Sequence, residues 1–217
     1  MTRPDIRFPG ESDEYRRHRD ALLKAELALT EQVERVAQLR RTMPLGGRVA
    51  DYKFDGAQGT VYLSELFGEH ETLIVYSYMF DETSAPCPMC SAFLDSIKGQ
   101  LPHVNRRAAF AVVARSSMPR IAQLVKSRGW QDLPWVSSAN NTYSVDYLSE
   151  MPDGSQAPVC NVFVRRKEGI YHFWHCEAFF ASDQTHPRHL DMIWPLWHIL
   201  DLTPQGRGDF MPLLTDD

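Results

Sequence analysis

The sequence has no apolar run near the roughly 18 residues that a membrane-spanning helix needs. Its first ten residues also lack the apolar segment of a signal peptide. It has no excess of positive charge: 23 Lys and Arg stand against 28 Asp and Glu, so the net charge is −5. Proteins that bind nucleic acid usually present a basic face. We therefore predict a cytoplasmic protein that binds neither a membrane nor nucleic acid.

Glycine is sparse, with 12 residues, and no glycine-rich phosphate loop is present. The pair Gly206 and Gly208 follows no predicted strand and opens no predicted helix, so it is not a dinucleotide fingerprint. We predict no bound cofactor. Cysteine is also scarce: the chain has four. A cytoplasmic compartment keeps thiols reduced, so these cysteines are not expected to form structural disulfides, and their spacing becomes informative.

The order of predicted elements describes an α/β sandwich with a mixed sheet. Hydrophobic residues make up 43% of 217, which is enough for one good core. Apolar runs predict buried central strands, and turn residues separate them from helices. The predicted elements are a strand over 71–80, a helix from 88 to 98, a strand over 110–114, a helix from 119, a short strand at 135–136, a hairpin of strands 159–164 and 170–174, and a helix over 187–200.

Before the sheet, one long helix is predicted from Ser12 to about Arg41, after a loose arm over residues 1–10. Ser12 can cap it, and Pro44 with Gly46-Gly47 can end it. We therefore divide the chain into an arm and helix over 1–46 and a domain over 47–217. The helix either lies across its own domain or forms a homodimer with a second copy.

The sharpest motif is Cys87-Pro88-Met89-Cys90, which falls between a hydrophobic strand and a helix. Proline is well tolerated at the first position of a helix, so the helix is expected to begin at Pro88. A cysteine there faces unpaired backbone N–H groups and the positive end of the helix dipole, and both stabilise a thiolate. We predict Cys87 as the attacking thiolate and Cys90, one turn later, as the buried resolving thiol.

Metal binding is the main chemical alternative. A structural zinc site needs four ligands, usually two paired motifs, and the sequence has one CxxC pair. The other candidates are Cys160, His172, His175 and Cys176. An odd separation places His172 and His175 on opposite sides of a regular strand, which argues against a shared metal. Cys160 is interpreted as a buried core thiol. Cys176 beside His175 could form an activated pair, but no third group orients it.

Several stretches together resemble the bacterial domain-of-unknown-function 899 family of the thioredoxin-like superfamily. They are Tyr52–Gly56, Leu63–Phe67, Ile74–Phe80, Cys87–Ser91, Gly129–Trp130, Trp135–Ser138 and Asp201–Arg207. The resemblance covers roughly residues 15 to 210. It implies a thioredoxin-like three-layer α/β/α sandwich with an extra long N-terminal helix, and it supplies no established activity.

A thioredoxin-like fold also gives Pro158 a possible role. A cis-proline at this point of the fold lies beside the CxxC motif and holds the preceding backbone open to pair with a substrate peptide. Cis X–Pro bonds are uncommon, so an ordinary trans proline that starts a strand is the alternative.

The segment 54–90 is also similar to the peroxide-reducing branch of the superfamily. That branch places a proline seven residues before the catalytic cysteine, where this chain has Phe80, and Thr or Ser three residues before it, where Ser84 is acceptable. No matching arginine is evident. A peroxidase therefore fits less well than dithiol exchange.

These observations favour a thiol–disulfide oxidoreductase in which Cys87, Cys90 and Pro158 form the site. Its substrate would be a disulfide-containing protein or a small thiol compound, and a reductant thiol or a reductase would restore it. The alternative, from another class, is a non-catalytic thioredoxin-like protein that binds a partner or dimerises through its N-terminal helix.

Overall fold

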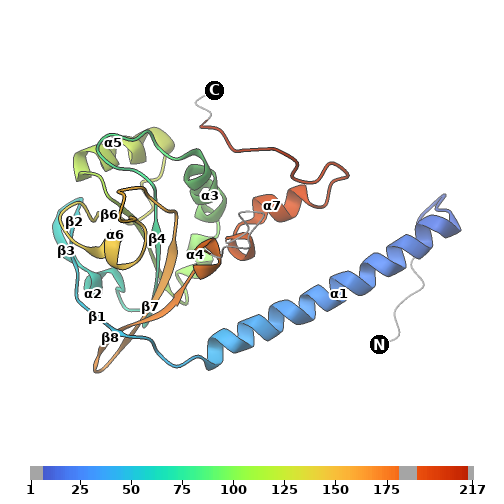
Figure 1. The fold of residues 1–217 in the computed structure, drawn as a ribbon, viewed down its shortest axis with the longest axis horizontal. Helices are drawn as coiled ribbons and strands as arrows, with labels where there is room; N and C mark the ends of the chain where they lie inside the picture. Colours follow the sequence, from blue (N-terminus) through green and yellow to red (C-terminus); the bar gives the residue numbers. More distant parts are fainter. Residues whose placement is uncertain (1–6, 181–189, 215–217) are drawn as a thin grey trace. The chain divides into compact units, whose positions relative to one another are not determined.

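The computed structural model describes residues 7–180 and 190–214 (Figure 1). The chain divides into two compact units, Met1–Pro44 and Leu45–Asp217. The strands are β1 (Arg48–Val49), β2 (Lys53–Gly56), β3 (Gly59–Tyr62), β4 (Thr72–Ser77), β5 (Ala109–Ala114), β6 (Trp135–Ser137), β7 (Cys160–Arg166) and β8 (Gly169–His175). The helices are α1 (Asp13–Thr42), α2 (Leu63–Leu66), α3 (Pro88–Lys98), α4 (Leu101–Val104), α5 (Met118–Arg128), α6 (Tyr143–Asp146) and α7 (Pro195–Leu200), with 3-10 turns η1 (Glu177–Phe180) and η2 (Asp191–Ile193).

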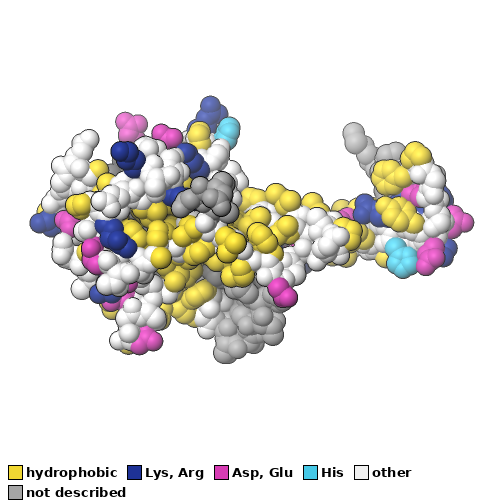
Figure 2. Space-filling model, turned by 90° about the horizontal axis from the view of Figure 1, so that it is seen from above, with side chains coloured by type: hydrophobic (Ala, Val, Ile, Leu, Met, Phe, Trp, Pro, Cys, Tyr) yellow, Lys and Arg dark blue, Asp and Glu magenta, His cyan; other side chains and the backbone are white. Residues whose placement is uncertain are grey.

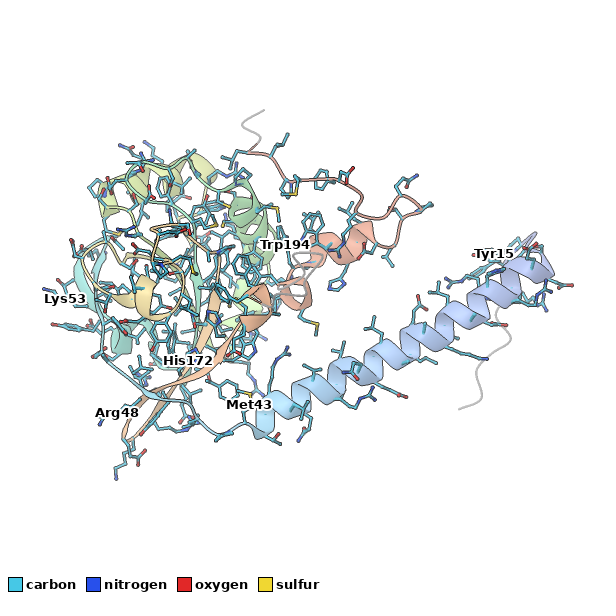
Figure 3. The ribbon with its side chains drawn as sticks, viewed as in Figure 1. Tyr15, Met43, Arg48, Lys53, His172 and Trp194 are labelled. Atoms are coloured by element: carbon cyan, nitrogen blue, oxygen red, sulfur yellow. The ribbon has the colours of Figure 1, made fainter. Side chains whose placement is uncertain are left out.

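The first unit is the long helix α1, as the sequence predicted. The hydroxyl of Ser12 accepts a hydrogen bond from the backbone N–H of Tyr15 at 3.1 Å, which caps the first turn. Tyr15 lies near the start of the helix and Met43 just beyond its end (Figure 3). Acidic residues occupy the first turn and arginines the last, and charges of these signs at these ends interact favourably with the helix dipole.

In the second unit the described strands form one sheet in the order β1-β8-β7-β4-β5-β6-β2-β3. Strand β4 pairs parallel with β5 and antiparallel with β7, and β7 pairs antiparallel with β8. A parallel strand–helix–strand unit followed by an antiparallel hairpin, with this order of strands, is the thioredoxin-like arrangement. The predicted fold class is therefore confirmed.

Both faces of the sheet are covered, which gives three layers. Along β4, Ile74 and Tyr76 pack into one core and Leu73 and Val75 into the other, because side chains alternate across a strand. Residues of α3, α5 and α7 cover the first core. The short helices α2 and α6 contribute Leu63 and Tyr143 to the second core, with Phe163 of β7. Burial on both faces explains why β4 and β5 are continuous apolar runs.

The predicted helix over 187–200 is wrong in its extent. Residues 187–189 lie outside the described residues. After them the chain forms the turn η2 and then a separate helix, α7, which begins at Pro195. A proline inside a helix lacks the N–H for the hydrogen bond one turn back and its ring clashes with the preceding turn. Pro195 is accommodated because it occupies the first helical position.

Apolar side chains in yellow reach the surface among charged ones (Figure 2). In α1 they include Leu22 and Leu29, whose side chains are 45% and 63% exposed. None of the described helices is both long enough and apolar enough to cross a bilayer.

Candidate active site

Cys87 is the N-cap residue of α3, and the helix begins at Pro88 as predicted. Its backbone is extended, with φ −70° and ψ 121°, and its Sγ accepts a hydrogen bond from the backbone N–H of Cys90 at 3.3 Å. The carbonyl of Cys87 accepts the first helical hydrogen bond, from the N–H of Ser91 at 2.9 Å. The thiol therefore does what serine or aspartate does at other helix starts, accepting an N–H that has no partner within the helix.

This position lowers the pKa of the Cys87 thiol from 9.0 to about 7. The largest cause is the hydrogen bond from the thiol of Cys90, and the backbone N–H groups of Cys90 and Met89 add to it, while partial burial opposes them. Hydrogen bonds donated to a thiolate favour the charged form and burial disfavours it. Near neutral pH about half of Cys87 is thus the nucleophilic species.

Cys90 has the opposite environment. Its side chain is fully buried, and burial, together with the neighbouring Cys87 thiolate, raises its pKa well above 9.0. The phenol of Tyr76 and the backbone N–H of Met79 hydrogen-bond to its sulfur and lower its pKa in part. All four cysteines are free thiols in the structure. The pair thus combines a partly exposed, acidic thiol with a buried one that holds its proton.

A hydrogen-bonded chain fixes the backbone of Cys87. The hydroxyl of Ser91 donates to the Cys87 carbonyl at 2.9 Å, and the phenol of Tyr78 hydrogen-bonds the same hydroxyl at 2.7 Å. Tyr78 and Ser91 are almost completely buried. The sequence reasoning missed Tyr76, Tyr78 and Ser91. Ser91 is detectable in principle, because a serine four residues after the cap can reach back to that residue's carbonyl.

Arg120 of α5 and Gln156 hold the loop that precedes Cys87. The Arg120 guanidinium donates to the carbonyls of Asp81 at 3.0 Å and Ser84 at 2.6 Å, and it lies 4.5 Å from the ring centre of Phe80. Gln156 accepts from the N–H of Phe80 and donates to the Asp81 carboxylate, both at 2.9 Å. Both residues are distant from the motif in sequence, so no local pattern predicts these contacts.

Pro158 follows directly in the segment that carries Gln156. The Ala157–Pro158 peptide bond is trans, so the possibility of a cis bond is not realised. The backbone on either side is already paired: the N–H of Ala157 donates to Ser149 at 3.0 Å, and the carbonyl of Val159 accepts from Ser77 at 2.8 Å. Pro158 thus leads into β7 as an ordinary strand-starting proline. Its predicted role in substrate docking stays a prediction.

Cys160 and Cys176 lie side by side in the core, away from solvent. The Sγ of Cys176 accepts the N–H of Cys160 at 3.1 Å, and the N–H of Cys176 donates to the Cys160 carbonyl at 3.2 Å. Burial raises the pKa of both thiols, and for Cys160 the neighbouring Cys176 adds to the effect. Raised pKa values and burial make inert thiols.

The prediction that His172 and His175 lie on opposite sides of the strand is wrong. The register of β7 and β8 shifts: Val162 pairs with Trp174 and Phe163 with His172, so one residue of β8 is skipped. Such a bulge reverses the alternation of side chains. The two imidazoles have ring centres 6.5 Å apart, and His172 Nε2 is 3.1 Å from Asn161 Oδ1. Figure 3 labels His172 on β8.

The proximity of His172 and His175 does not create a metal site. Across residues 7–180 and 190–214 no group of three or more His, Cys, Asp or Glu side chains could hold a metal ion. Burial, the largest cause, lowers the pKa of both imidazoles. They are better described as packing histidines of β8: His175 is buried at the end of the strand, and His172 is half-buried in its middle.

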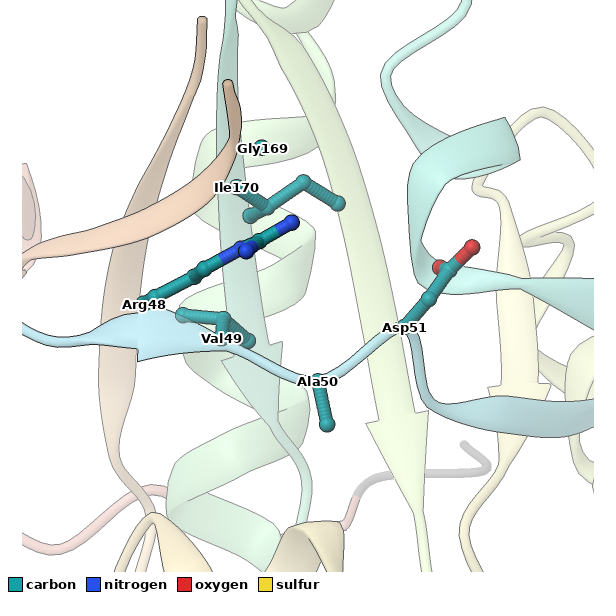
Figure 4. Close-up of a pocket in the computed structure, with 6 residues that line it drawn as sticks. All are labelled: Arg48, Val49, Ala50, Asp51, Gly169 and Ile170. Carbon is teal, nitrogen blue, oxygen red and sulfur yellow. The ribbon is translucent and has the colours of Figure 1, made fainter.

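A pocket of about 480 Å³ lies apart from the thiols. Its lining residues are Arg48, Val49, Ala50, Asp51, Gly169 and Ile170 (Figure 4). Gly169 has φ +145°, and a Cβ there would stand 2.8 Å from Nε of Arg48. The Asp51 carboxylate is already bound to the N–H and hydroxyl of Ser64, both at 2.8 Å. The pocket therefore carries no group poised for reaction.

The loop before Cys87 also bears on the peroxidase alternative. Phe80 is buried at the position where the peroxide-reducing motif has proline. The Ser84 hydroxyl accepts the backbone N–H of Asp81 at 2.9 Å, so it serves to shape its own loop. The described geometry gives that alternative no added support.

No curated protein matches the chain at a significant level. Solved structures that are similar include peroxiredoxin Q of Xanthomonas campestris (C84S mutant; 17% identity, 62% of this chain and 85% of that chain, TM-score 0.46). Peroxidoxin BcpB of Mycobacterium tuberculosis is 18% identical over 70% of this chain and 94% of that chain, with a TM-score of 0.46. A hypothetical protein of Sinorhizobium meliloti is 21% identical over 67% of this chain and 75% of that chain, with a TM-score of 0.41. The family model described as "Bacterial protein of unknown function (DUF899)" matches residues 4–213, so the chain belongs to that family, as its motifs predicted.

Proposed function

We propose that the protein is a thiol–disulfide oxidoreductase that works through Cys87 and Cys90. The observation that carries the proposal is the asymmetry of the pair: Cys87 caps α3, is partly exposed and has a pKa of about 7, while Cys90 is buried and keeps its proton. An acidic, accessible thiol with a resolving thiol one turn away is the arrangement that exchange chemistry needs.

The exchange begins with a substrate that contains a disulfide. The Cys87 thiolate attacks one sulfur and forms a mixed disulfide, and the other substrate sulfur leaves and takes up a proton. Cys90 then loses its proton and attacks Cys87 Sγ, which releases the second substrate thiol and leaves a Cys87–Cys90 disulfide. The substrate gains two electrons, and a reductant thiol or a reductase restores the pair. We expect this cycle to run in the cytoplasm.

Redox titration tests the proposal. Wild-type protein equilibrated with mixtures of reduced and oxidised glutathione should form a Cys87–Cys90 disulfide, seen by mass spectrometry, with a midpoint between about −270 and −120 mV, the range of known dithiol proteins. Cys87→Ser and Cys90→Ser should each abolish the disulfide, and Cys160→Ala should leave the midpoint in place. Thiols that stay reduced throughout this range would refute the proposal.

A second candidate is a non-catalytic protein that dimerises through α1. Leu22, Leu29, Val33 and Val36 recur on one side of the helix, and the first three are exposed. Leu29 is 63% exposed, so pairing with a second copy would remove apolar surface from water. Dimerisation itself is compatible with either candidate, and the two differ in whether Cys87 and Cys90 react.

A further inference from the structure

Three loops meet at the edge of the sheet where Cys87 lies. Strands β4 and β5 are parallel and end at Ser77 and Ala114, while β7 is antiparallel to β4 and starts with Cys160 opposite Tyr76. The loops over 78–87 and 147–159, and the segment 115–120 that leads into the first turn of α5, therefore lie at one edge. Hydrogen bonds from Arg120 and Gln156 tie the second and third loops to the first.

Methionine is concentrated at this edge. The four residues concerned, called the methionine rim, are Met79, Met89, Met118 and Met151; each is partly exposed and packs against the core that contains Cys90. Met89 stands between the two cysteines, and its backbone N–H hydrogen-bonds to Cys87. Met118 begins α5, and Met151 bonds through its N–H to Ser155 at 2.8 Å in the loop before Pro158. Unbranched thioether side chains adapt to apolar surfaces of varied shape.

The charges of the three loops favour some disulfides over others. Four carboxylates, on Asp81, Glu82, Glu150 and Asp153, stand against two guanidiniums, on Arg115 and Arg120. The guanidiniums are engaged: Arg115 pairs with Glu150 at 2.8 Å, and Arg120 binds backbone carbonyls. An anionic disulfide such as glutathione disulfide therefore meets a net negative edge with no free cation in these loops.

We propose that the substrate of Cys87 is a disulfide within an apolar, neutral or basic polypeptide segment, and that the methionine rim contacts the apolar side chains beside it. This inference rests on the proposed function, since it names the substrate class of the same thiols. The chemical step is the exchange described above, in which the polypeptide disulfide gains two electrons and two protons and Cys87–Cys90 is oxidised.

The test uses the full chain, reduced and freed of reductant, in single-turnover reactions. The substrates are two peptides of equal length with one disulfide each, one flanked by leucine and phenylalanine and the other by aspartate and glutamate, together with glutathione disulfide. Because apolar contacts of one or two methylene groups change a rate about tenfold, we expect the apolar peptide to react about tenfold faster than the acidic one. Part of this preference should persist at high salt, which screens charge.

Matched variants separate the rim from the rest of the surface. The double variant Met118→Gln/Met151→Gln should lower the ratio of apolar to acidic rates about threefold, because it replaces apolar contact with polar groups. Met118→Leu/Met151→Leu keeps the apolar surface and should keep the ratio, as should Met211→Gln outside the rim. Equal rates for the two peptides in wild type, or an unchanged ratio in the glutamine variant, would overturn the inference. If none of the three disulfides reacts, the proposed function itself fails.

Discussion

At the scale of the residue, the central feature is a thiol that serves as a helix cap. The pKa of Cys87 is lowered to about 7, and it is set mainly by a hydrogen bond from the Cys90 thiol and then by backbone N–H groups. Because the pKa is depressed, the thiolate dominates above pH 7 and is lost as the pH falls through that value. The pH dependence of its reactivity therefore reports directly on the local geometry.

Alkylation with iodoacetamide should show this dependence. In the native protein the rate should reach half its maximum near pH 7, and peptide mapping should place the label on Cys87. Cys87→Ser should remove this fast phase, since Cys90, Cys160 and Cys176 are buried. Cys90→Ala should move the midpoint upward, because the thiol that donates to Cys87 is gone while the backbone N–H groups remain. A native midpoint near 8.5 would contradict the geometry.

Arg120 offers a second prediction at this scale. Arg120→Lys replaces a planar group that binds two carbonyls with a single ammonium, so we expect about 1–2 kcal/mol of lost stability in urea unfolding. Arg106→Lys is the matched control, because Arg106 is exposed and should change stability little. Equal effects of the two substitutions would show that the loop before Cys87 does not depend on Arg120.

At the scale of the element, the ends of α3 and α5 form a natural comparison. Both helices end at a glycine, but Gly129 after α5 has φ +65° and Gly99 after α3 has φ −65°. A Cβ would meet nothing within 4 Å at either position. The two sites therefore differ in backbone conformation and not in the room available for a side chain.

Gly129→Ala should destabilise the protein by about 1 kcal/mol, because an alanine in the left-handed region crowds the following carbonyl. Gly99→Ala should be neutral or stabilise by about 0.4–1 kcal/mol, since alanine adopts that φ freely and restricts the unfolded chain. Urea denaturation of the two variants beside wild type gives the difference. Effects of the same sign would show that the two caps are equivalent.

The elements also show how far sequence reasoning reaches. Local rules placed α1, the start of α3 at Pro88 and the buried strands, because capping, proline and apolar patterning act within a few residues. These local rules gave wrong predictions where a residue distant in sequence determines the conformation. The bulge that turns His172 and His175 to one side is set by pairing with β7. The break before α7 is a local effect of Pro195, and the prediction of one continuous helix over 187–200 does not take it into account.

The features of the candidate site also divide into those that local sequence predicts and those that depend on distant residues. The CxxC motif and its place at a helix start could be read from residues 87–90 alone. The groups that hold it, Tyr76, Tyr78, Arg120 and Gln156, come from β4 and its end, α5 and the loop before β7. Their roles depend on the order of the strands in the sheet, which cannot be read from a single sequence.

At the scale of the whole molecule, the oligomeric state is the open prediction. If α1 pairs with a second copy, Leu29→Glu should shift the protein toward the monomer in sedimentation velocity, because it places a charge in the apolar stripe. Leu27→Glu is the control: Leu27 is 57% exposed and lies on the opposite side of the helix. A wild-type monomer at all concentrations would remove the dimer proposal.

The hydrogen bond from the N–H of Cys90 to the sulfur of Cys87, at the start of α3, depends on the oxidation state of the pair. The N–H of Cys90 has an acceptor while Cys87 is a thiolate, and a disulfide sulfur is a far poorer one. The fold thus favours its own dithiol form, and more strongly as the pH rises from 7 to 9, where a reference thiol is still protonated and Cys87 is not. The hydrogen bond from Cys90 therefore makes the pair a milder reductant of substrate disulfides than the same pair without it, and the direction of the proposed exchange is unchanged.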